Sequence, residues 1–396
     1  MYDSLFIFSI KMGKVHSTPV LKALLLVAAA AAVRCFHLEG QSLWNDELFS
    51  FNVANLPLRE IQPALTTYYH HPPLFFYLLH FVLRVFGNYA WALRLISAIG
   101  GSLTVGVVYI CAERFFGRRA GLIAGLLCLF APFHLAYSQE GRPYALAALL
   151  ALIGFYFLME ITLEQKKWHI VWYAVTSLAL LHTHHWGIFV LASHLVFILV
   201  FAGASRDLKK KFGLVWLAVG VLYVPAALAL FQQATTHSRA GWFWVDRPNP
   251  AEVVNLGFAF AGSYFKMASA VFDLPMVLKI VSGTAIMIFF LTSMKAVLGK
   301  SANVAMRGVV LCFGVSLALP FAVSFIRPEI FLWYRYSVIV FPVFCVCIGG
   351  VTMIERWKAV TIAAVAILIL VGVFGTVRYY SWSKANVKDV AAYDQE

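Results

Sequence analysis

The sequence predicts an all-helical protein that crosses a membrane many times. Of its 396 residues, 62% are hydrophobic and only 12% are charged, and the mean hydropathy is +0.81. Soluble globular domains carry fewer apolar and more charged residues, so this composition excludes an ordinary soluble domain. At about twenty residues per membrane helix, a chain of this length has room for roughly ten to thirteen spans joined by short loops.

Apolar runs of the length of a membrane helix recur from residue 19 to about residue 380. Before them, residues 1–18 are expected to be a cytoplasmic segment that continues into an uncleaved signal anchor, and residues 381–396 are expected to be a short polar tail. The whole pattern predicts about eleven to thirteen transmembrane helices. The clearest spans are residues 19–36, 89–112, 120–137, 145–162, 168–181, 187–202, 212–231, 274–294, 309–326, 337–354 and 360–377.

The basic residues predict the orientation of these spans. The formal net charge is +13, but lysines and arginines are spread over short loops between apolar runs. Such loops lie in the cytoplasm by the positive-inside rule, so the charge does not indicate nucleic acid, although it suits anionic lipid. The loops expected in the cytoplasm lie around Arg118, Lys166, Lys210, Lys300 and Arg356, and those expected on the extracytoplasmic face lie around Glu140, His184, Trp242 and Arg335.

The first extracytoplasmic loop is expected to be long and to cover residues 37–88. Its last part, residues 72–86, is apolar but short, and it begins with two prolines. A full crossing there would place the basic segment 114–119 outside, against the positive-inside rule. We therefore expect a juxtamembrane or re-entrant helix over 72–86, with a short full crossing as the alternative.

Asp46 and Glu47 are adjacent carboxylates within this loop of a chain that has few charges. A carboxylate there could act as a general base toward an acceptor hydroxyl or help to hold a divalent metal ion. The structural alternative is a helix start, where acidic residues are favoured. Farther along the loop, His70 and His71 precede Pro72, which suggests either packing at the interface or contact with a phosphate or metal ion.

Two arginines are expected on the same face. Arg142 follows Glu140 at a helix start, so the two form either a surface ion pair or, through the guanidinium, a phosphate site. Arg335 lies between Tyr334 and Tyr336 and is either an anchor at the membrane boundary or an anion ligand.

Histidines and tryptophans complete the polar residues of the outer loops. His182, His184 and His185 form either an interfacial packing motif or, with outer carboxylates, a metal site. Trp242 and Trp244 suit an aromatic belt at the membrane boundary, or a platform for a sugar face or prenyl chain.

The order of these features resembles the polyprenyl-phosphate-sugar-dependent glycosyltransferases with the GT-C fold. The resemblance is closest to the bacterial family 39 and protein-mannosyltransferase-like branch, to which the aminoarabinose transferases of lipid A are related. It covers most of the chain and is strongest from about residue 42 to residue 158. The matching elements are Trp44-Asn45-Asp46-Glu47, His71-Pro72-Pro73-Leu74, Phe86-Gly87, Arg94, Ser138-Gln139-Glu140-Gly141-Arg142-Pro143-Tyr144, the outer histidines ending at Gly187, and Arg335-Tyr336.

The resemblance implies a GT-C transmembrane domain over residues 19–380 of a multi-pass protein in the cell (inner) membrane. The implied reaction moves one sugar from a polyprenyl-phosphate donor to a glycan, lipid or protein acceptor on the extracytoplasmic face, with inversion. Asp46 is implied as the catalytic carboxylate, with support from Glu47.

The resemblance also implies residues for the donor phosphate and for a metal ion. His71 would lie near the phosphate, with Arg142 and Arg335 as further contacts. Relatives differ in metal use, and the candidates here for a divalent ion are the side chains of Glu140, His184 and His185.

Two other functions compete with a glycosyltransferase. A flippase or transporter of a lipid-linked sugar would carry charged residues or broken helices near the middle of its spans, often in repeated halves. Here the polar clusters lie at the ends of spans, and the sequence shows no internal repeat. A non-catalytic assembly subunit would tolerate the loss of Asp46.

Overall fold

A computed structural model describes residues 18–69, 71–164, 167–201, 205–240, 248–267, 270–298, 303–354 and 358–382. Nearly all regular structure in these segments is helical, which confirms the predicted all-α class. The exception is a two-stranded antiparallel hairpin of β1 (Tyr264–Met267) and β2 (Ala270–Asp273). The predicted N-terminal segment before residue 18, the tail beyond residue 382 and the loop of Trp242 and Trp244 lie outside the described residues.

The first half of the chain forms a membrane-type helix, a group of short helices and then a series of packed helices. In order, these elements are α1 (Thr18–Cys35), α2 (Asn45–Asn55), α3 (Leu58–Ala64), the π-helix η1 (Leu65–Tyr69), α4 (Leu74–Phe86), α5 (Ala90–Phe116), α6 (Arg118–Leu129), α7 (Pro132–Ser138), α8 (Tyr144–Glu164), α9 (Lys167–Thr183), α10 (Gly187–Val196) and the π-helix η2 (Phe197–Phe201).

The second half begins with a long helix that has a proline, Pro225, inside it. The hairpin replaces part of the amphipathic stretch expected over residues 251–270. The elements are α11 (Arg206–Ala240), α12 (Pro250–Phe260), the hairpin, α13 (Met276–Leu298), α14 (Val304–Val323), the 3₁₀ turns η3 (Pro328–Ile330) and η4 (Tyr336–Ile339), α15 (Phe341–Val351) and α16 (Lys358–Tyr380).

Six of the described helices are long and apolar enough to cross a membrane, namely α5, α8, α11, α13, α14 and α16. Helices α6 and α7 make a seventh span if the pair is counted as one. The chain is thus a multi-pass membrane protein. By this criterion the long spans are fewer than the eleven to thirteen expected, because several expected spans fold as shorter apolar helices, among them α10 and α15.

The span expected over residues 120–137 is not one continuous helix, because the chain bends by 62° between α6 and α7. Pro132 is the first residue of α7, and Ala131 before it is extended, with φ −88° and ψ 106°. Proline disfavours helical geometry in the residue that precedes it and lacks the N–H for a helical hydrogen bond. The break brings the end of α7 to the loop that carries Glu140 and Arg142.

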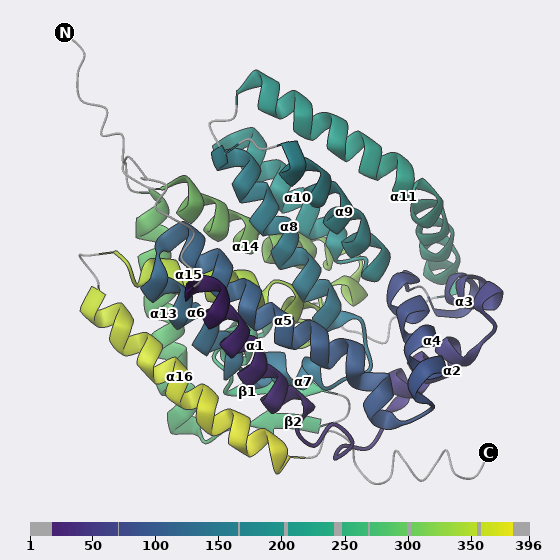
Figure 1. Ribbon diagram of the computed structural model, residues 1–396, viewed down its shortest axis with the longest axis horizontal. Helices are drawn as coiled ribbons and strands as arrows, with labels where there is room; N and C mark the ends of the chain where they lie inside the picture. Colours follow the sequence, from purple (N-terminus) through teal and green to yellow (C-terminus); the bar gives the residue numbers. More distant parts are fainter. Residues whose placement is uncertain are drawn as a thin grey trace.

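Helix α5 lies at the centre of the fold, where it packs against α1, α6, α8 and α15 (Figure 1). Helix α15 is buried along its whole length and packs closely on α6. A Cβ atom at Gly349 would lie only 2.6 Å from the carbonyl oxygen of Ala120, so this contact requires glycine. The close packing fixes α15, and with it the segment that carries Arg335 just before η4.

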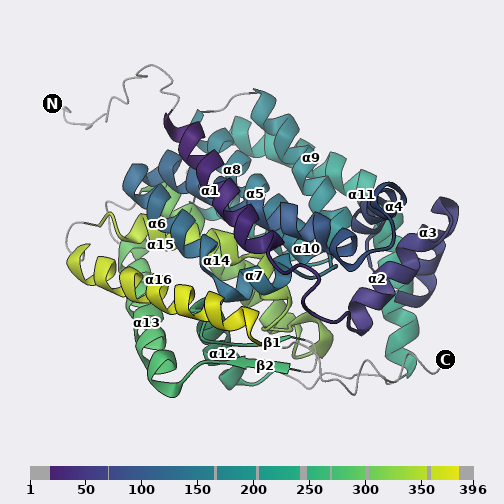
Figure 2. The ribbon, with the colours of Figure 1, turned by 60° about the horizontal axis from the view of Figure 1, so that its bottom comes forward.

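Helices α2, α3 and α4 gather at one end of the molecule, remote from α13 (Figures 1 and 2). One face of α4 is buried through residues such as Phe75 and Leu79, while Phe81 and Val85 on another face are exposed. An amphipathic helix of 13 residues suits the surface of a membrane better than its full depth. The juxtamembrane position of this segment stays a prediction.

Candidate active site

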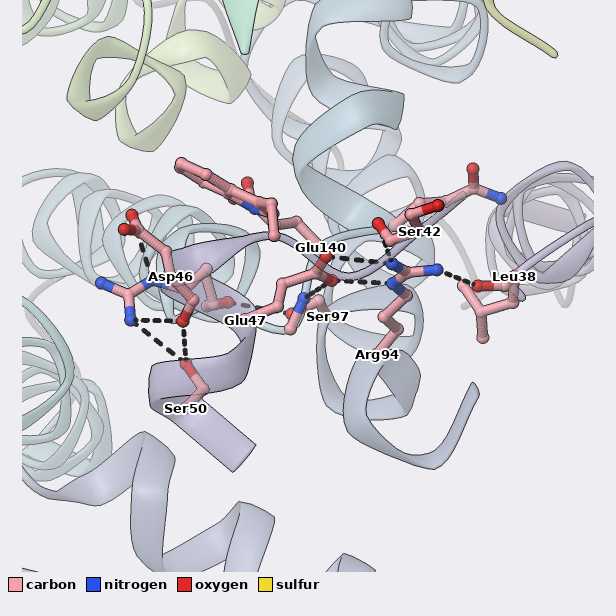
Figure 3. A network of polar contacts seen from close by, with 12 residues as sticks. Leu38, Ser42, Asp46, Glu47, Ser50, Arg94, Ser97 and Glu140 are labelled. Carbon is pink, nitrogen blue, oxygen red and sulfur yellow. Dashed lines mark hydrogen bonds and ion pairs between the residues drawn. The ribbon is translucent and has the colours of Figure 1, made fainter. Parts of the chain in front are cut away.

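Asp46 and Glu47 lie in the first turn of α2, directly after an extended Trp44. Their carboxylates point to opposite sides of the helix (Figure 3). This follows from helix geometry, since successive residues are rotated by about 100°. The Glu47 side chain is fully buried, whereas the Asp46 side chain is 27% exposed. The two adjacent acids therefore have different surroundings and different uses.

Glu47 joins α2 to α5 and to the loop before α8. Its carboxylate accepts two hydrogen bonds from Arg94, of 2.7 and 2.9 Å, and one of 2.9 Å from the backbone N–H of Gly141. Arg94 also donates to the carbonyl oxygens of Leu38 and Ser42 (Figure 3). A buried bidentate pair with this many further hydrogen bonds is rigid. Glu47 thus supports the neighbouring Asp46 by fixing the start of α2.

Asp46 lies between two arginines that come from distant parts of the sequence. Arg335 donates a hydrogen bond of 2.9 Å from Nη1 to Oδ2 of Asp46. The Nε atom of Arg142 lies 3.9 Å from the same oxygen. The guanidinium of Arg335 also stacks over the ring of Trp44, 5.2 Å from its centroid. One partly exposed carboxylate thus faces two cations.

Arg142 is buried and held from several sides. It donates to the backbone oxygen of Asp46 and to Oγ of Ser50, and its guanidinium lies over the ring of Phe49. Its Nη2 atom lies 2.9 Å from Nε2 of His71. Since Arg142 can only donate, Nε2 of His71 accepts this bond. The structure thus brings together the predicted residues Asp46, His71 and Arg142.

The environment of His71 favours its neutral form. Burial lowers the pKa of His71 well below its usual value, and the positive charge of Arg142 lowers this pKa further. A neutral His71 can accept the hydrogen bond from Arg142 and so fix the direction of that guanidinium. In this geometry His71 positions the guanidinium of Arg142, and its expected place near the donor phosphate stays a prediction.

Glu140 lies beside the two carboxylates of α2 but belongs to the loop before α8. Its Oε1 accepts a hydrogen bond of 2.9 Å from Nε1 of Trp44, the residue that stacks on Arg335. Glu140 is buried. Its observed contact orients Trp44 and, through Trp44, Arg335.

The three metal-ligand candidates do not converge. His185 points toward α11, with its Nδ1 3.2 Å from the hydroxyl of Tyr223. Nδ1 of His184 accepts the backbone N–H of Trp186, and the described residues contain no group of three His, Cys, Asp or Glu side chains that could hold a metal ion. Glu140, His184 and His185 therefore do not fit a divalent ion, and no step proposed below uses one.

Sequence reasoning gave Arg94 no role beyond its match to the family pattern. The structure shows that Arg94 is the buried partner of Glu47. A sequence signal was present, because Arg94 is an isolated charge near the start of an apolar helix and such a charge requires a partner. Ser50 and Phe49, which hold Arg142, gave no such signal.

Comparison with known proteins agrees with the fold. Residues 70–231 match the family model described as dolichyl-phosphate-mannose-protein mannosyltransferase. This segment includes His71, Arg142 and His184 but ends before Arg335. A comparison with curated protein sequences gave no match.

Two kinds of solved structure share the fold. Crystal structures of ArnT from Cupriavidus metallidurans, in the apo state and bound to undecaprenyl phosphate, superpose with a TM-score of 0.58 at 16% identity, covering 92% of this chain and 77% of that chain. The apo oligosaccharyltransferase from Archaeoglobus fulgidus gives 0.56 at 15% identity, over 92% and 57% of the two chains. Another structure of that enzyme, in complex with Zn and sulfate, gives 0.57 at 15% identity, with 92% and 54% covered.

Similarity at this level of identity shows a common architecture. The family match adds that the central part of the chain has the sequence pattern of a sugar transferase. Together these findings agree with the resemblance inferred from the sequence: the chain shares the fold of ArnT and of the archaeal oligosaccharyltransferase, and its central part matches the mannosyltransferase family model.

Proposed function

We propose that this protein transfers a sugar from a polyprenyl-phosphate donor to a hydroxyl of a glycan, lipid or protein acceptor, on the extracytoplasmic face of the inner membrane. The donor class is supported by the names of the proteins that the chain resembles, a dolichyl-phosphate-mannose-dependent transferase family and ArnT bound to undecaprenyl phosphate. The face is supported by the loop charges, because the site residues lie on loops opposite to the basic ones.

The observation that carries the proposal is the position of Asp46 between Arg335 and Arg142. A transferase that uses a lipid-phosphate donor needs a carboxylate beside a cluster of cations. The cations bind the phosphate, and the carboxylate removes the proton of the acceptor. A partly exposed Asp46 beside two arginines meets both needs in one small volume.

The proposed step is a single displacement. The acceptor oxygen forms a bond to the anomeric carbon while the bond from that carbon to the phosphate oxygen breaks. The hydroxyl proton passes to the carboxylate of Asp46, and the electron pair of the broken bond remains on the lipid phosphate. Attack from the side opposite the leaving group inverts the anomeric carbon.

The arginines neutralise the charge that develops on the leaving phosphate. In the structure Arg335 is paired with Asp46, so an incoming phosphate competes with the carboxylate for the guanidinium. Phosphate binding would thereby release Asp46 to act as a base. His71, Glu47 and Glu140 hold these groups in place through Arg142, Arg94 and Trp44 respectively.

A flippase or transporter of a lipid-linked sugar is the alternative function. It would use the same arginines to bind the phosphate but would have no need for a base. The two functions therefore differ in what they predict for a variant at Asp46.

We expect Asp46→Asn to abolish sugar transfer, because the amide keeps the shape of the side chain but cannot accept the acceptor's proton. The measurement is the transfer of labelled sugar from a polyprenyl-phosphate sugar by the purified protein, in an assay that can detect the transfer of one sugar per protein molecule. The expected loss is at least 100-fold, within the range typical of general-base catalysis.

Glu60→Gln is the matched control, since Glu60 is an exposed acid on α3 whose only ion pair among the described residues is a long contact of 3.8 Å with Arg59. This control should transfer sugar like the wild type. Full activity in a folded Asp46→Asn protein would rule out Asp46 as the base. Lipid translocation that is unchanged in the variant, without any transfer by the wild type, would favour the flippase.

A further inference from the structure

A second cluster of buried polar groups lies directly behind the two arginines. The rings of Tyr144 and His184 lie 5.5 Å apart, and both contact the ring of Tyr336, at 6.1 and 5.1 Å. Arg142 connects this cluster to the site of Asp46, since its guanidinium lies 5.9 Å from the centroid of the Tyr144 ring. The cluster thus continues the proposed active site inward, toward α8 and the end of α9.

The hydrogen bonds of His184 determine which of its nitrogens carries the proton. Nδ1 accepts the backbone N–H of Trp186 at 3.1 Å. Burial lowers the pKa of His184 well below its usual value, with further contributions from His185, Arg142 and Arg335. The ring is therefore neutral, with its proton on Nε2. A protonated Nε2 is a hydrogen-bond donor and cannot be a metal ligand.

Three polar atoms of this cluster have no hydrogen-bond partner among the described residues. They are Nε2 of His184, the hydroxyl of Tyr144 and Nε of Arg142. All three side chains are at least nine-tenths buried. A buried donor without an acceptor costs free energy, so protein sites with several such donors are typically built to receive a ligand.

We propose that His184 and Tyr144 bind the sugar of the polyprenyl-phosphate donor through its oxygen atoms. This inference rests on the proposed function and adds the residues that recognise the sugar.

The chemistry of the cluster favours a sugar over a second phosphate. Its donors apart from Arg142 are neutral, whereas the positive charges are on the side of Asp46, where the donor phosphate is expected. The rings of Tyr144, Tyr336 and His184 pack against one another in this cluster. Aromatic rings with a few fixed polar groups are typical of sites for uncharged ligands.

Such a site would also discriminate between sugars. A sugar that lacks the oxygen facing His184 or Tyr144 would leave a buried donor without an acceptor, which is a strong basis for rejection.

The test compares the affinity of the full-length protein in lipid nanodiscs for two classes of ligand. One is undecaprenyl phosphate without sugar. The other is the same lipid carrying mannose, glucose or 4-aminoarabinose. Binding is measured by competition against radiolabelled undecaprenyl phosphate, and the sugar that wild type binds most tightly is then used for the variants.

We expect Tyr144→Phe and His184→Phe each to weaken binding of the sugar-bearing lipid about tenfold, the loss typical of one buried hydrogen bond. Their affinity for the bare lipid should stay within about twofold of wild type. His184→Gln should retain more affinity than His184→Phe, because its amide can replace the Nε2 donor. The matched control is His182→Phe, which alters a histidine of α9 whose ring packs on Tyr223 and not on the rings of this cluster.

The outcomes separate this inference from the proposed function. Failure of the wild type to bind bare undecaprenyl phosphate would overturn the proposed function. Normal binding of the bare lipid without a preference for any of the three sugars would overturn the sugar site alone. The same conclusion would follow if Tyr144→Phe and His184→Phe kept the wild-type preference, or weakened both ligands equally.

Discussion

At the scale of single residues, the main finding is the separation of two adjacent acids. The sequence could show that Asp46 and Glu47 are unusual in so apolar a chain, but it could not assign their roles. In the structure the two acids have different surroundings: Glu47 forms a fully buried ion pair with Arg94, whereas the partly exposed Asp46 pairs with Arg335. The buried ion pair of Glu47 holds α2 in place, whereas the partly exposed Asp46 can exchange its arginine partner for another ligand.

We expect Glu47→Gln to destabilise the protein much more than Asp46→Asn does. Removing one member of a buried ion pair leaves the other charge without compensation, at a cost of about 3–5 kcal/mol. Asp46 is partly exposed and the amide of Asn keeps an acceptor oxygen for Arg335, so its replacement should cost less stability than the loss of the fully buried Glu47. Thermal unfolding of both variants in the same detergent would check this order.

The double variant Glu47→Gln with Arg94→Met gives the control for that prediction, because it removes the unpaired charge as well. It should recover part of the lost stability. Equal melting temperatures for wild type and Glu47→Gln would show that the Arg94 pair does not hold α2 in place.

For the other site residues, the sequence predicted which side chains share one face of the membrane, but not the directions in which neighbouring side chains point. His71, Arg142 and Arg335 were expected on one face from the loop charges alone, and the structure brings their side chains together around Asp46. The divergence of His184 and His185 was not predictable. It results from the turn after α9, which directs one ring toward Tyr336 and the other toward Tyr223.

At the scale of helices, hydropathy predicted where apolar helices occur better than it predicted whether each of them is unbroken. Long apolar runs such as α5 and α8 were found close to their expected bounds. The expected span over residues 120–137 is broken before Pro132, and the expected span over 337–354 begins with a 3₁₀ turn and only then becomes α15. Hydropathy averages over a window of about nineteen residues, so it does not detect a local break.

The placement of α4 leads to a prediction on topology. A cysteine at the exposed Asn88, which follows α4, should react with an impermeant thiol reagent added outside intact cells. The reason is that α4 is short and amphipathic, so the loop after it should return to the same side as Asp46. Native Cys35 is exposed and must first be replaced by serine, whereas the other five cysteines are buried.

Arg118→Cys is the internal reference for this experiment, since Arg118 is exposed in a basic loop expected in the cytoplasm. It should react only after the cells are permeabilised. The reverse pattern, with protection at residue 88 and labelling at residue 118, would show that residues 72–86 cross the membrane.

At the scale of the whole molecule, the site depends on packing that joins the two halves of the chain. Asp46 and Arg335 are 289 residues apart in the sequence. They meet because α15 is buried against α6 and because η4, which directly follows Arg335, packs on α8, which directly follows the loop of Glu140 and Arg142. The sequence predicted the architecture through the resemblance, but the contact itself depends on side-chain packing such as that of Gly349, for which hydropathy gives no signal.

Burial of His184 makes the free energy of unfolding of the whole protein depend on pH. In the folded protein the pKa of His184 is lowered, whereas in the unfolded chain it returns to about 6.5. The unfolded state therefore takes up the proton more readily, and stability is full above pH 6.5 and falls as the pH drops below it. Between pH 7.5 and pH 5.5 this one group therefore lowers the free energy of unfolding.

His184→Gln should lack this part of the pH dependence. Its melting temperature in detergent should therefore fall less than that of the wild type between pH 7.5 and pH 5.5, while the exposed-acid variant Glu60→Gln should follow the wild type. The other histidines are present in all three proteins, so the comparison of slopes isolates the contribution of His184 together with its coupling to His71 and His185. Parallel slopes for His184→Gln and wild type would mean that His184 is charged in the folded state. In that case the neutral ring on which the assignment of Nε2 as a donor depends would be wrong.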